Sequence, residues 1–189
     1  MQRSIMIVGV GGQGTLLASR ILGNLLVDRG YDVKVSEVHG MSQRGGSVVT
    51  YVKYGDKVHS PIIDNGEADI VLAFELLEAY RALPALKCGG RLIVNNQRIN
   101  PMPVITGAAQ YPENIIEKLS EKVDTTAVDA LALAKEAGNI KAVNVVLIGV
   151  MAKSTNIPYE VWMDALRDTV PPKFLDVNLK AFELGYGAQ

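Results

Sequence analysis

A length of 189 residues is enough for one domain with a full apolar core. The formal net charge of -1 and the 6% share of aromatic residues argue against a protein that binds nucleic acid or an anionic membrane. The one cysteine, Cys88, can form neither an internal disulfide nor, by itself, a metal cluster. The chain begins without a signal-peptide pattern and has no apolar run near the roughly 20 residues that cross a bilayer, so we expect a cytoplasmic protein.

The first 38 residues predict a β–α–β unit. The apolar run at 5–8 is typical of a buried strand, and it ends at glycines. After Gly14, leucine and isoleucine recur at helical spacing until Gly30, a residue type that is common just beyond a helix end. Residues 31–38 alternate and contain β-branched side chains, which indicates a second strand.

The middle of the chain predicts more strands and two helices. Valines and tyrosines alternate from residue 47, and Gly55 with Asp56 predicts the turn of an antiparallel hairpin within 47–61. The other elements expected here are a central strand, a helix ended by Gly89 and Gly90, a further strand, a helix with an early proline and a last short strand, at 69–74, 75–86, 91–95, 111–122 and 123–125.

The chain from about residue 127 onward predicts mostly helix, in segments separated by prolines. No repeat, low-complexity segment or linker divides the sequence. We therefore expect an α/β fold in a single domain over 1–189. It would have a Rossmann-like, mostly parallel sheet, an antiparallel hairpin and a helical C-terminal part at about 127–189.

The loop GVGGQG carries the glycines of a dinucleotide-binding fingerprint. Gly9, Gly11 and Gly14 fit the pattern G-x-G-x-x-G between a strand and a helix, and Gly12 adds backbone freedom. The helix start would offer free N–H groups and a positive dipole end to a phosphate. Glu37 lies near the position of an acid that binds a ribose. The pattern alone leaves open dinucleotide binding and a merely tight strand–helix corner.

A second loop, HGMSQRGG, is rich in groups that bind anions. Ser42, Gln43 and Arg44 offer a hydroxyl, an amide and a guanidinium, while Gly45 and Gly46 offer bare N–H groups. The guanidinium can hold a phosphate or carboxylate with two hydrogen bonds, or pair with an acid in the loop or across an interface. Both loops are predicted to leave the carboxyl ends of adjacent strands, the edge where open α/β sheets bind ligands.

The two loops together resemble a known family. GVGGQGTLLASRILG followed by EVHGMSQRGGSVVTYVKYG is similar to the gamma-type domain of 2-oxoacid:ferredoxin oxidoreductases. Within that family the chain most resembles the form that stands alone as the beta subunit of indolepyruvate ferredoxin oxidoreductases. The resemblance covers nearly the whole chain, including SPII, ADIVLAFELLEA and the helical tail with NVVLIG. The paired loops at this spacing are specific, whereas the glycine pattern alone is not.

The resemblance implies a division of labour. A large partner chain would bind thiamine diphosphate with magnesium and carry [4Fe–4S] clusters. The complex would oxidatively decarboxylate an aryl-2-oxoacid, transfer the acyl group to coenzyme A (CoA) and reduce ferredoxin. This chain has no cysteine set for a cluster and no G-D-G followed by a distant N-N, so we expect it to hold no cofactor, to supply no catalytic residue and to be inactive alone. An orphaned docking surface would favour a homodimer of the isolated subunit.

The candidate site therefore consists of the two loops, with CoA phosphate contact or partner docking as its function. Its members are Gly9, Gly11, Gly12, Gln13, Gly14, Ser42, Gln43, Arg44, Gly45 and Gly46. Three alternatives stay open: a gamma subunit specific for pyruvate or another 2-oxoacid, a small NAD(P)- or flavin-binding Rossmann protein, and a nucleotide-sensing module without chemistry.

Simple structural roles are expected for the other notable side chains. His39 would hydrogen-bond within its loop, although a general base is the alternative. Cys88 would be a packed side chain at a helix end. Asn95 and Asn96, which end a strand at the functional edge, would cap a neighbouring element, with lining of the site as the alternative. Trp162, with Met163 and Leu166, would lie in the core or an interface.

Overall fold

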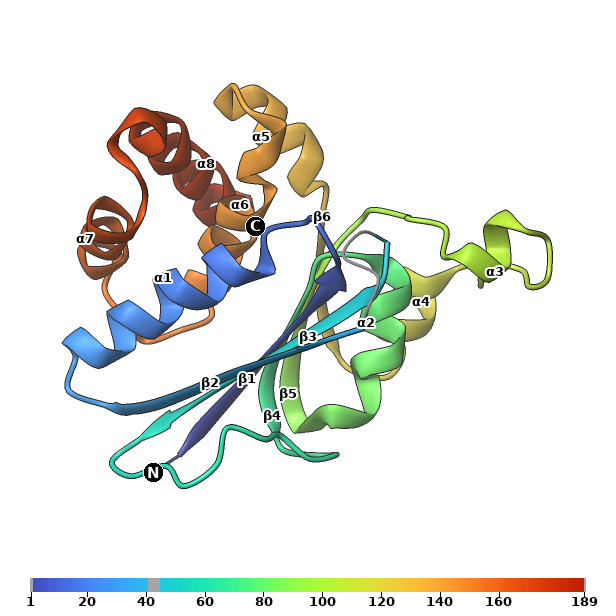
Figure 1. The fold of residues 1–189 in the computed structure, drawn as a ribbon, viewed down its shortest axis with the longest axis horizontal. Helices are drawn as coiled ribbons and strands as arrows, with labels where there is room; N and C mark the ends of the chain where they lie inside the picture. The colour runs from blue at the N-terminus through green and yellow to red at the C-terminus, as the bar shows by residue number, and fades with distance from the viewer. Residues whose placement is uncertain (1, 41–44, 189) are drawn as a thin grey trace.

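In the computed structural model, residues 2–40 and 45–188 are described. Within them, six strands form one sheet in the order β2-β3-β1-β4-β5-β6 (Figure 1). The strands are β1 (Arg3–Val10), β2 (Asp32–His39), β3 (Ser47–Gly55), β4 (Ala68–Ala73), β5 (Leu86–Asn95) and β6 (Asp124–Val128). β1, β4, β5 and β6 pair in parallel, and β3 runs against both of its neighbours. The predicted α/β fold with a mostly parallel sheet is confirmed.

Helices cover both faces of the sheet. They are α1 (Thr15–Asp28), α2 (Leu76–Ala82), α3 (Met102–Ile105), α4 (Ile115–Ser120), α5 (Ala130–Ala137), α6 (Val143–Ala152), α7 (Tyr159–Thr169) and α8 (Leu175–Gly187). One core joins α1 and α5–α8 to the face that carries Ile5 and Ile7, and a second core joins α2 and α4 to the face of Met6 and Val8. The alternation of side chains along β1 thus supplies both cores. The expected helical C-terminal part is present.

The antiparallel hairpin lies elsewhere than predicted. β2 and β3 form it, with Asp32 opposite Gly55 and His39 opposite Val48, and β3 inserts between β2 and β1. The prediction of a hairpin across Gly55 and Asp56 was wrong, because no strand follows Gly55 before β4 and Pro61 has no N–H to donate to a strand partner. β1 and β2 are consequently not adjacent. The expectation that the two loops leave the ends of adjacent strands was therefore wrong.

Several expected boundaries also shift. The helix predicted at 75–86 is shorter, because Pro84 lies in a 3-10 turn (Leu83–Ala85) that follows α2. Gly89 and Gly90 do not end a helix; they lie in β5, at an irregularity where the pairing with β4 changes register. A Cβ on Gly90 would lie 3.0 Å from the Ala68 carbonyl oxygen, so glycine permits close strand approach here. Cys88 is therefore an exposed strand residue rather than a packed side chain at a helix end.

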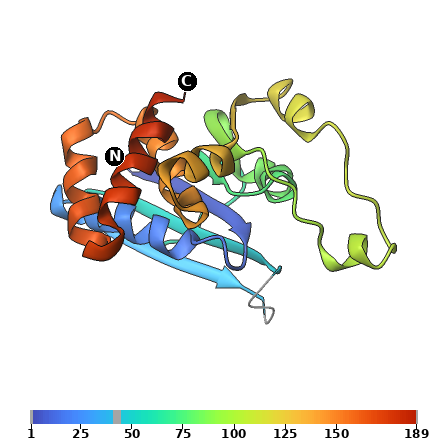
Figure 2. The same cartoon turned by 90° about the horizontal axis from the view of Figure 1, so that it is seen from above.

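The segment between β5 and α4 projects from the body. It carries α3 and extends away from the sheet (Figure 2). Its side chains Met102 and Ile105 are about two-thirds exposed. The helix predicted at 111–122 begins only at Ile115, because Asn114 adopts a left-handed conformation with φ 54°. Asn95, at the end of β5, accepts a hydrogen bond from the first N–H of α5, which confirms its expected capping role.

The C-terminal helices are fixed by close packing. Trp162, Met163 and Leu166 on α7 are buried in the first core, as predicted. α6 is buried along its whole length, and it meets α8 at Gly149 and Gly185. Two facing glycines let the helix backbones approach more closely than any side chain would permit.

Candidate functional site

The glycine loop connects β1 to α1 at the carboxyl edge of the sheet. The Gly11 N–H donates to the Gly46 carbonyl oxygen at 2.9 Å, so this loop is hydrogen-bonded directly to the second loop. The two loops predicted to form one site therefore meet, although β3 separates their parent strands. Ser42, Gln43 and Arg44 fall outside the described residues, while Gly45 and Gly46 begin the return into β3.

Gln13 holds the glycine loop against the sheet. Its side-chain oxygen accepts from the Val10 N–H at 2.7 Å, and its amide nitrogen donates to the Phe74 carbonyl oxygen at 3.0 Å. The same nitrogen lies 3.3 Å from the Gln97 side-chain oxygen. An amide that bridges two strand ends in this way fixes the shape of the loop, because each buried backbone group that it satisfies would otherwise lose a partner.

The glycines of the loop differ in what surrounds them. A Cβ on Gly9 would lie 3.0 Å from the Phe74 Cβ, and one on Gly14 would lie 2.8 Å from the Asn144 side-chain nitrogen. These two glycines make room for the protein itself. Gly12 has φ +101° and no atom of the described residues within 4 Å of its Cβ position. Of these three glycines, Gly12 is therefore the one with open space beside it in the described part of the chain.

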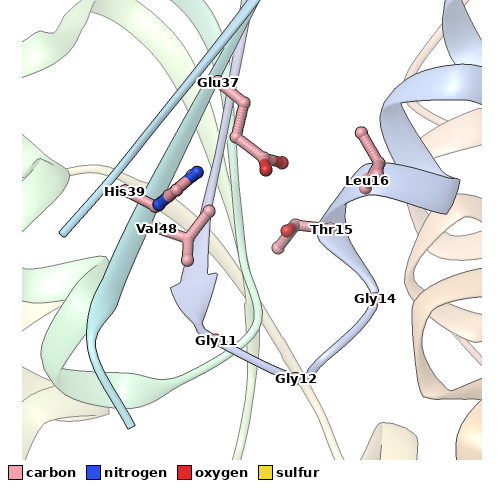
Figure 3. Close-up of a pocket in the computed structure, with 8 residues that line it drawn as sticks. All are labelled: Gly11, Gly12, Gly14, Thr15, Leu16, Glu37, His39 and Val48. Atoms are coloured by element: carbon pink, nitrogen blue, oxygen red, sulfur yellow. The ribbon is translucent and has the colours of Figure 1, made fainter. Parts of the chain in front are cut away.

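One hollow lies on the β2 side of the loop, and we call it the Glu37 hollow. It has a volume of about 270 Å³. Figure 3 shows the Glu37 carboxylate turned toward Thr15 and Leu16 at the start of α1. The Thr50 hydroxyl donates to this carboxylate at 3.1 Å. The lining residues are Gly11, Gly12, Gly14, Thr15, Leu16, Glu37, His39 and Val48.

His39 also lines the Glu37 hollow, beside Val48 of the neighbouring strand (Figure 3). Its Nδ1 lies 3.0 Å from the Gly40 carbonyl oxygen, which agrees with the expected loop hydrogen bond. The imidazole is exposed at the end of the edge strand β2. The Glu37 hollow therefore has a carboxylate and an imidazole among its lining side chains.

A second hollow lies on the other side of the glycine loop, and we call it the Lys141 hollow. It has a volume of about 540 Å³, within the usual range for small-molecule sites. Its lining residues are Gly12, Gln13, Gly14, Gln97, Leu131, Ile140, Lys141 and Val143. Gly12 and Gly14 line both hollows, so the loop forms the wall between them.

Two buried carboxylates support this edge, and sequence analysis did not single them out. Glu75 is 1% exposed and accepts from the Ile99 N–H, the Glu78 N–H and the Tyr111 hydroxyl. Burial, together with the Glu75 carboxylate, raises the pKa of Tyr111 well above its usual range, so this hydroxyl stays protonated as a donor. The available signal was ELLE, in which Glu75 is an N-cap and Glu78 is the third helical residue.

Glu78 connects α2 to the second loop. It accepts from the Ser47 hydroxyl at the first position of β3, at 2.5 Å, and from Arg81 at 2.6 Å. Ser47 follows Gly46, so this hydrogen bond fixes the end of the second loop. Asn144, in the first turn of α6, has a similar role for the glycine loop, because its amide donates to the Gly14 carbonyl oxygen at 3.2 Å. Its signal was a single polar residue in the apolar run of α6.

Among residues 2–40 and 45–188, no three His, Cys, Asp or Glu side chains gather in a way that could hold a metal ion. In the same part of the chain, no helix has both the length and the apolar character to cross a membrane.

These features define a class of protein: a Rossmann-like α/β chain with two linked glycine loops at the carboxyl edge of its sheet. The family model described as pyruvate ferredoxin/flavodoxin oxidoreductase matches residues 4–188. The chain therefore belongs to this family of oxidoreductases, and the family resemblance predicted from the two loops is confirmed.

Relatives with described roles match this chain over nearly the full length of both proteins. The indolepyruvate oxidoreductase subunit IorB of Thermococcus kodakarensis is 44% identical over 98% of this chain and 95% of that protein. The pyruvate/ketoisovalerate oxidoreductases common subunit gamma of the same organism is 28% identical over 93% and 90%. The crystal structure of the keto/oxoacid ferredoxin oxidoreductase gamma subunit from Geobacter sulfurreducens is 26% identical, with a TM-score of 0.72 over 98% of this chain and 96% of that chain.

Proposed function

We propose that this chain is the small subunit of an indolepyruvate-type 2-oxoacid:ferredoxin oxidoreductase. The complex converts an aryl-2-oxoacid and CoA to an acyl-CoA and carbon dioxide, and the electrons released pass to ferredoxin. The observation that carries the choice of substrate is the comparison within one organism: 44% identity to its indolepyruvate subunit against 28% to its pyruvate/ketoisovalerate gamma subunit. The same difference argues against a pyruvate-specific homologue.

The cofactors of the reaction belong to a larger partner chain in this proposal. A [4Fe–4S] cluster needs about four cysteine ligands, and this sequence has one cysteine. Thiamine diphosphate with magnesium supplies the decarboxylation chemistry on the partner. The present chain docks on that partner in the cytoplasm and contributes its two glycine loops, either to the CoA phosphates or to the docking surface.

The glycine loop suits contact with a phosphate. Gly14 is the N-cap of α1 and has no side chain to cap the helix, and Gly12 has no described atom near its Cβ position. An uncapped helix start favours an anion through its free N–H groups and its dipole. Ser42, Gln43 and Arg44 complete the proposed set from the second loop. Gln13 acts indirectly, because its amide is engaged in holding the loop.

Co-purification from the native cell tests the proposal. The chain is isolated with whatever it binds, and reduction of a viologen dye is assayed with indolepyruvate and CoA. We expect a large iron–sulfur partner and activity that requires both substrates. A lone chain that carries bound NAD or FAD would overturn the proposal, and the Glu37 hollow would then serve a dinucleotide ribose. Activity on pyruvate but not on indolepyruvate would overturn the choice of substrate alone.

A matched pair of glycine variants tests the loop. Gly12 and Gly30 have positive φ values of +101° and +82°, and neither has a neighbour within 4 Å of its Cβ position among the described residues. Gly12→Ala and Gly30→Ala therefore impose similar backbone strain at opposite ends of α1. We expect Gly12→Ala to weaken CoA use or assembly of the complex, and Gly30→Ala to leave both unchanged. Equal behaviour of the two complexes would remove the loop from the site.

A further inference from the structure

We infer that α3 (Met102–Ile105) docks into an uncharged, apolar groove of the larger partner chain, and that the closed base of the segment between β5 and α4 holds this helix in position. The inference rests on the proposed function, which supplies the partner. It deepens that function, because it names an element by which this chain holds the partner.

α3 presents an apolar face that nothing in the described chain covers. None of its four residues is buried. Met102 and Ile105 are 65% and 64% exposed, the two highest values among the large apolar side chains of the described residues. From Ile99 to Pro112 the sequence has no charged residue. An exposed apolar surface without charge is typical of a contact with another protein.

The position of α3 turns this face away from the body. The segment that carries α3 follows Asn95 at the carboxyl end of β5 and extends away from the sheet (Figure 2). Val104 of α3 packs against the second core. Met102 and Ile105 are three positions apart, so they share the other side of this helical turn and are left for a partner.

One buried carboxylate closes the base of the segment. Glu75 is 1% exposed, and one of its oxygens accepts from the Ile99 N–H at 3.0 Å and from the Tyr111 hydroxyl at 2.5 Å. A buried carboxylate is costly without its donors, so both donors stay fixed to it. Ile99 and Tyr111 lie on either side of α3 in the sequence. The two ends of the projecting segment are therefore joined at a single oxygen atom.

Three more contacts stiffen the base. The Tyr111 hydroxyl accepts from the Leu77 N–H at 3.0 Å, and the Arg98 guanidinium lies 4.3 Å from the centroid of the tyrosine ring. The Leu76 N–H donates to the Gln97 carbonyl oxygen at 3.0 Å. A projection that already has its bound shape loses little conformational entropy when it docks. The base therefore presents α3 to a partner in a fixed position.

Charge favours the larger chain over a second copy of this chain as the partner. An uncharged helix face needs an uncharged groove, because a charged side chain that is buried against apolar surface loses its water and gains no partner. Four hollows of the described chain each contain a charged side chain, at Glu37, Arg29, Lys141 and Glu113. These hollows on a second copy are therefore a poor match for α3. Within the complex, the groove belongs to the larger partner chain.

The first test compares two double variants in the assembled complex. Met102→Ala with Ile105→Ala removes the apolar face, and Val27→Ala with Ile62→Ala removes two side chains that are 57% and 45% exposed elsewhere on the chain. The complex is diluted, and its dissociation is followed by mass photometry. We expect the first pair to raise the dissociation constant about 100-fold, since loss of a central apolar contact commonly costs about tenfold. The second pair should leave it unchanged.

A photo-cross-linking residue identifies the partner. p-Benzoylphenylalanine replaces Ile105 in one chain and Met102 in another, and it replaces Val27 in the control. We expect illumination of the complex to join the first two chains to the larger chain, and the control to give no such product. Products that contain only copies of this chain would overturn the inference.

A double-mutant cycle tests the closed base. Tyr111→Phe removes the hydroxyl that joins the far end of the segment to Glu75. We expect it to raise the dissociation constant about tenfold in the parent chain, and to have no effect when Met102 and Ile105 are already alanine, because α3 then makes no contact that can be misplaced. An equal penalty in both backgrounds would assign the hydroxyl to folding alone and overturn the role of the base.

The docking of α3 and the proposed function fail in different ways. An unchanged dissociation constant in the chain with Met102→Ala and Ile105→Ala would overturn the docking of α3 and leave the proposed function intact. A parent chain that purifies from the native cell without a larger partner would refute the proposed function itself.

Discussion

The contact between α6 and α8 and the carboxyl edge of the sheet both depend on glycine, for opposite reasons. At the helix contact, a Cβ on Gly185 would lie 2.0 Å from the Val146 carbonyl oxygen, so glycine is needed because the space is already filled. At the carboxyl edge, no described atom lies within 4 Å of the Cβ position of Gly12, and side-chain amides hold the loop in shape. Gly185 thus serves packing at the helix contact, as Gly9 and Gly14 do in the loop, whereas Gly12 keeps the carboxyl edge open.

The largest effect on stability is expected at the helix contact. Gly185→Ala would force the α6 and α8 backbones apart, and we expect it to lower the free energy of unfolding by about 3 kcal/mol or more, as severe overpacking does. Gly187→Ala is the matched control in the same helix, because no described atom lies within 4 Å of its Cβ position. Thermal unfolding followed by circular dichroism compares the two.

The control should be neutral or slightly more stable than the parent chain, since alanine favours a helix over glycine. If Gly185→Ala unfolds at the same temperature as Gly187→Ala, α6 and α8 do not approach as closely as described. Gly185 would then not be needed for packing, and its role would not differ from that of Gly12.

A smaller loss of stability, joined to a loss of function, is expected at the carboxyl edge. Gln13→Ala removes the amide that satisfies the Val10 N–H and the Phe74 carbonyl oxygen. We expect the free energy of unfolding to fall by about 2 kcal/mol, the usual result of leaving buried polar groups without a partner. The KM of the complex for CoA should rise as well, because the loop loses its shape.

Gln110→Ala is the control for that variant, since Gln110 is exposed in the projecting segment that carries α3. Urea unfolding and CoA kinetics measure the two effects separately. A loss of stability with unchanged CoA kinetics would show that Gln13 serves folding alone, as Gly185 does, and the two regions would then differ less than proposed.

Local sequence patterns predicted the order of elements better than their contacts. The apolar run at 5–8, the glycine loop and the helix that ends before Gly30 were correct, because each depends on residues close in the chain. The insertion of β3 between β1 and β2 was missed, because strand pairing is not set by local spacing. Gly89 and Gly90 were taken for a helix end, since only the neighbouring strand reveals why β5 needs them.

The same limit applies to the candidate site. The glycine pattern predicted a loop at the carboxyl edge, but two of the hydrogen bonds that support it join residues 61 and 130 positions apart, Gln13 with Phe74 and Asn144 with Gly14. The difference between the open surroundings of Gly12 and the filled surroundings of Gly9 and Gly14 also follows only from the packing of distant residues. Sequence therefore indicated which loop could bind, and the structure indicates which of its residues face outward.

The smallest effect is expected at Cys88, which lies outside both regions. The thiol is exposed on β5, so Cys88→Ser should change the free energy of unfolding by less than about 0.5 kcal/mol, as surface substitutions usually do. The iron content of the complex and its rate of ferredoxin reduction should also stay the same, because the proposed function assigns all clusters to the partner chain. A loss of iron or of ferredoxin reduction in Cys88→Ser would mean that electrons or cluster ligands involve this chain. In that case this chain would contribute to electron transfer as well as through its carboxyl edge, and the assignment of all clusters to the partner chain would be wrong.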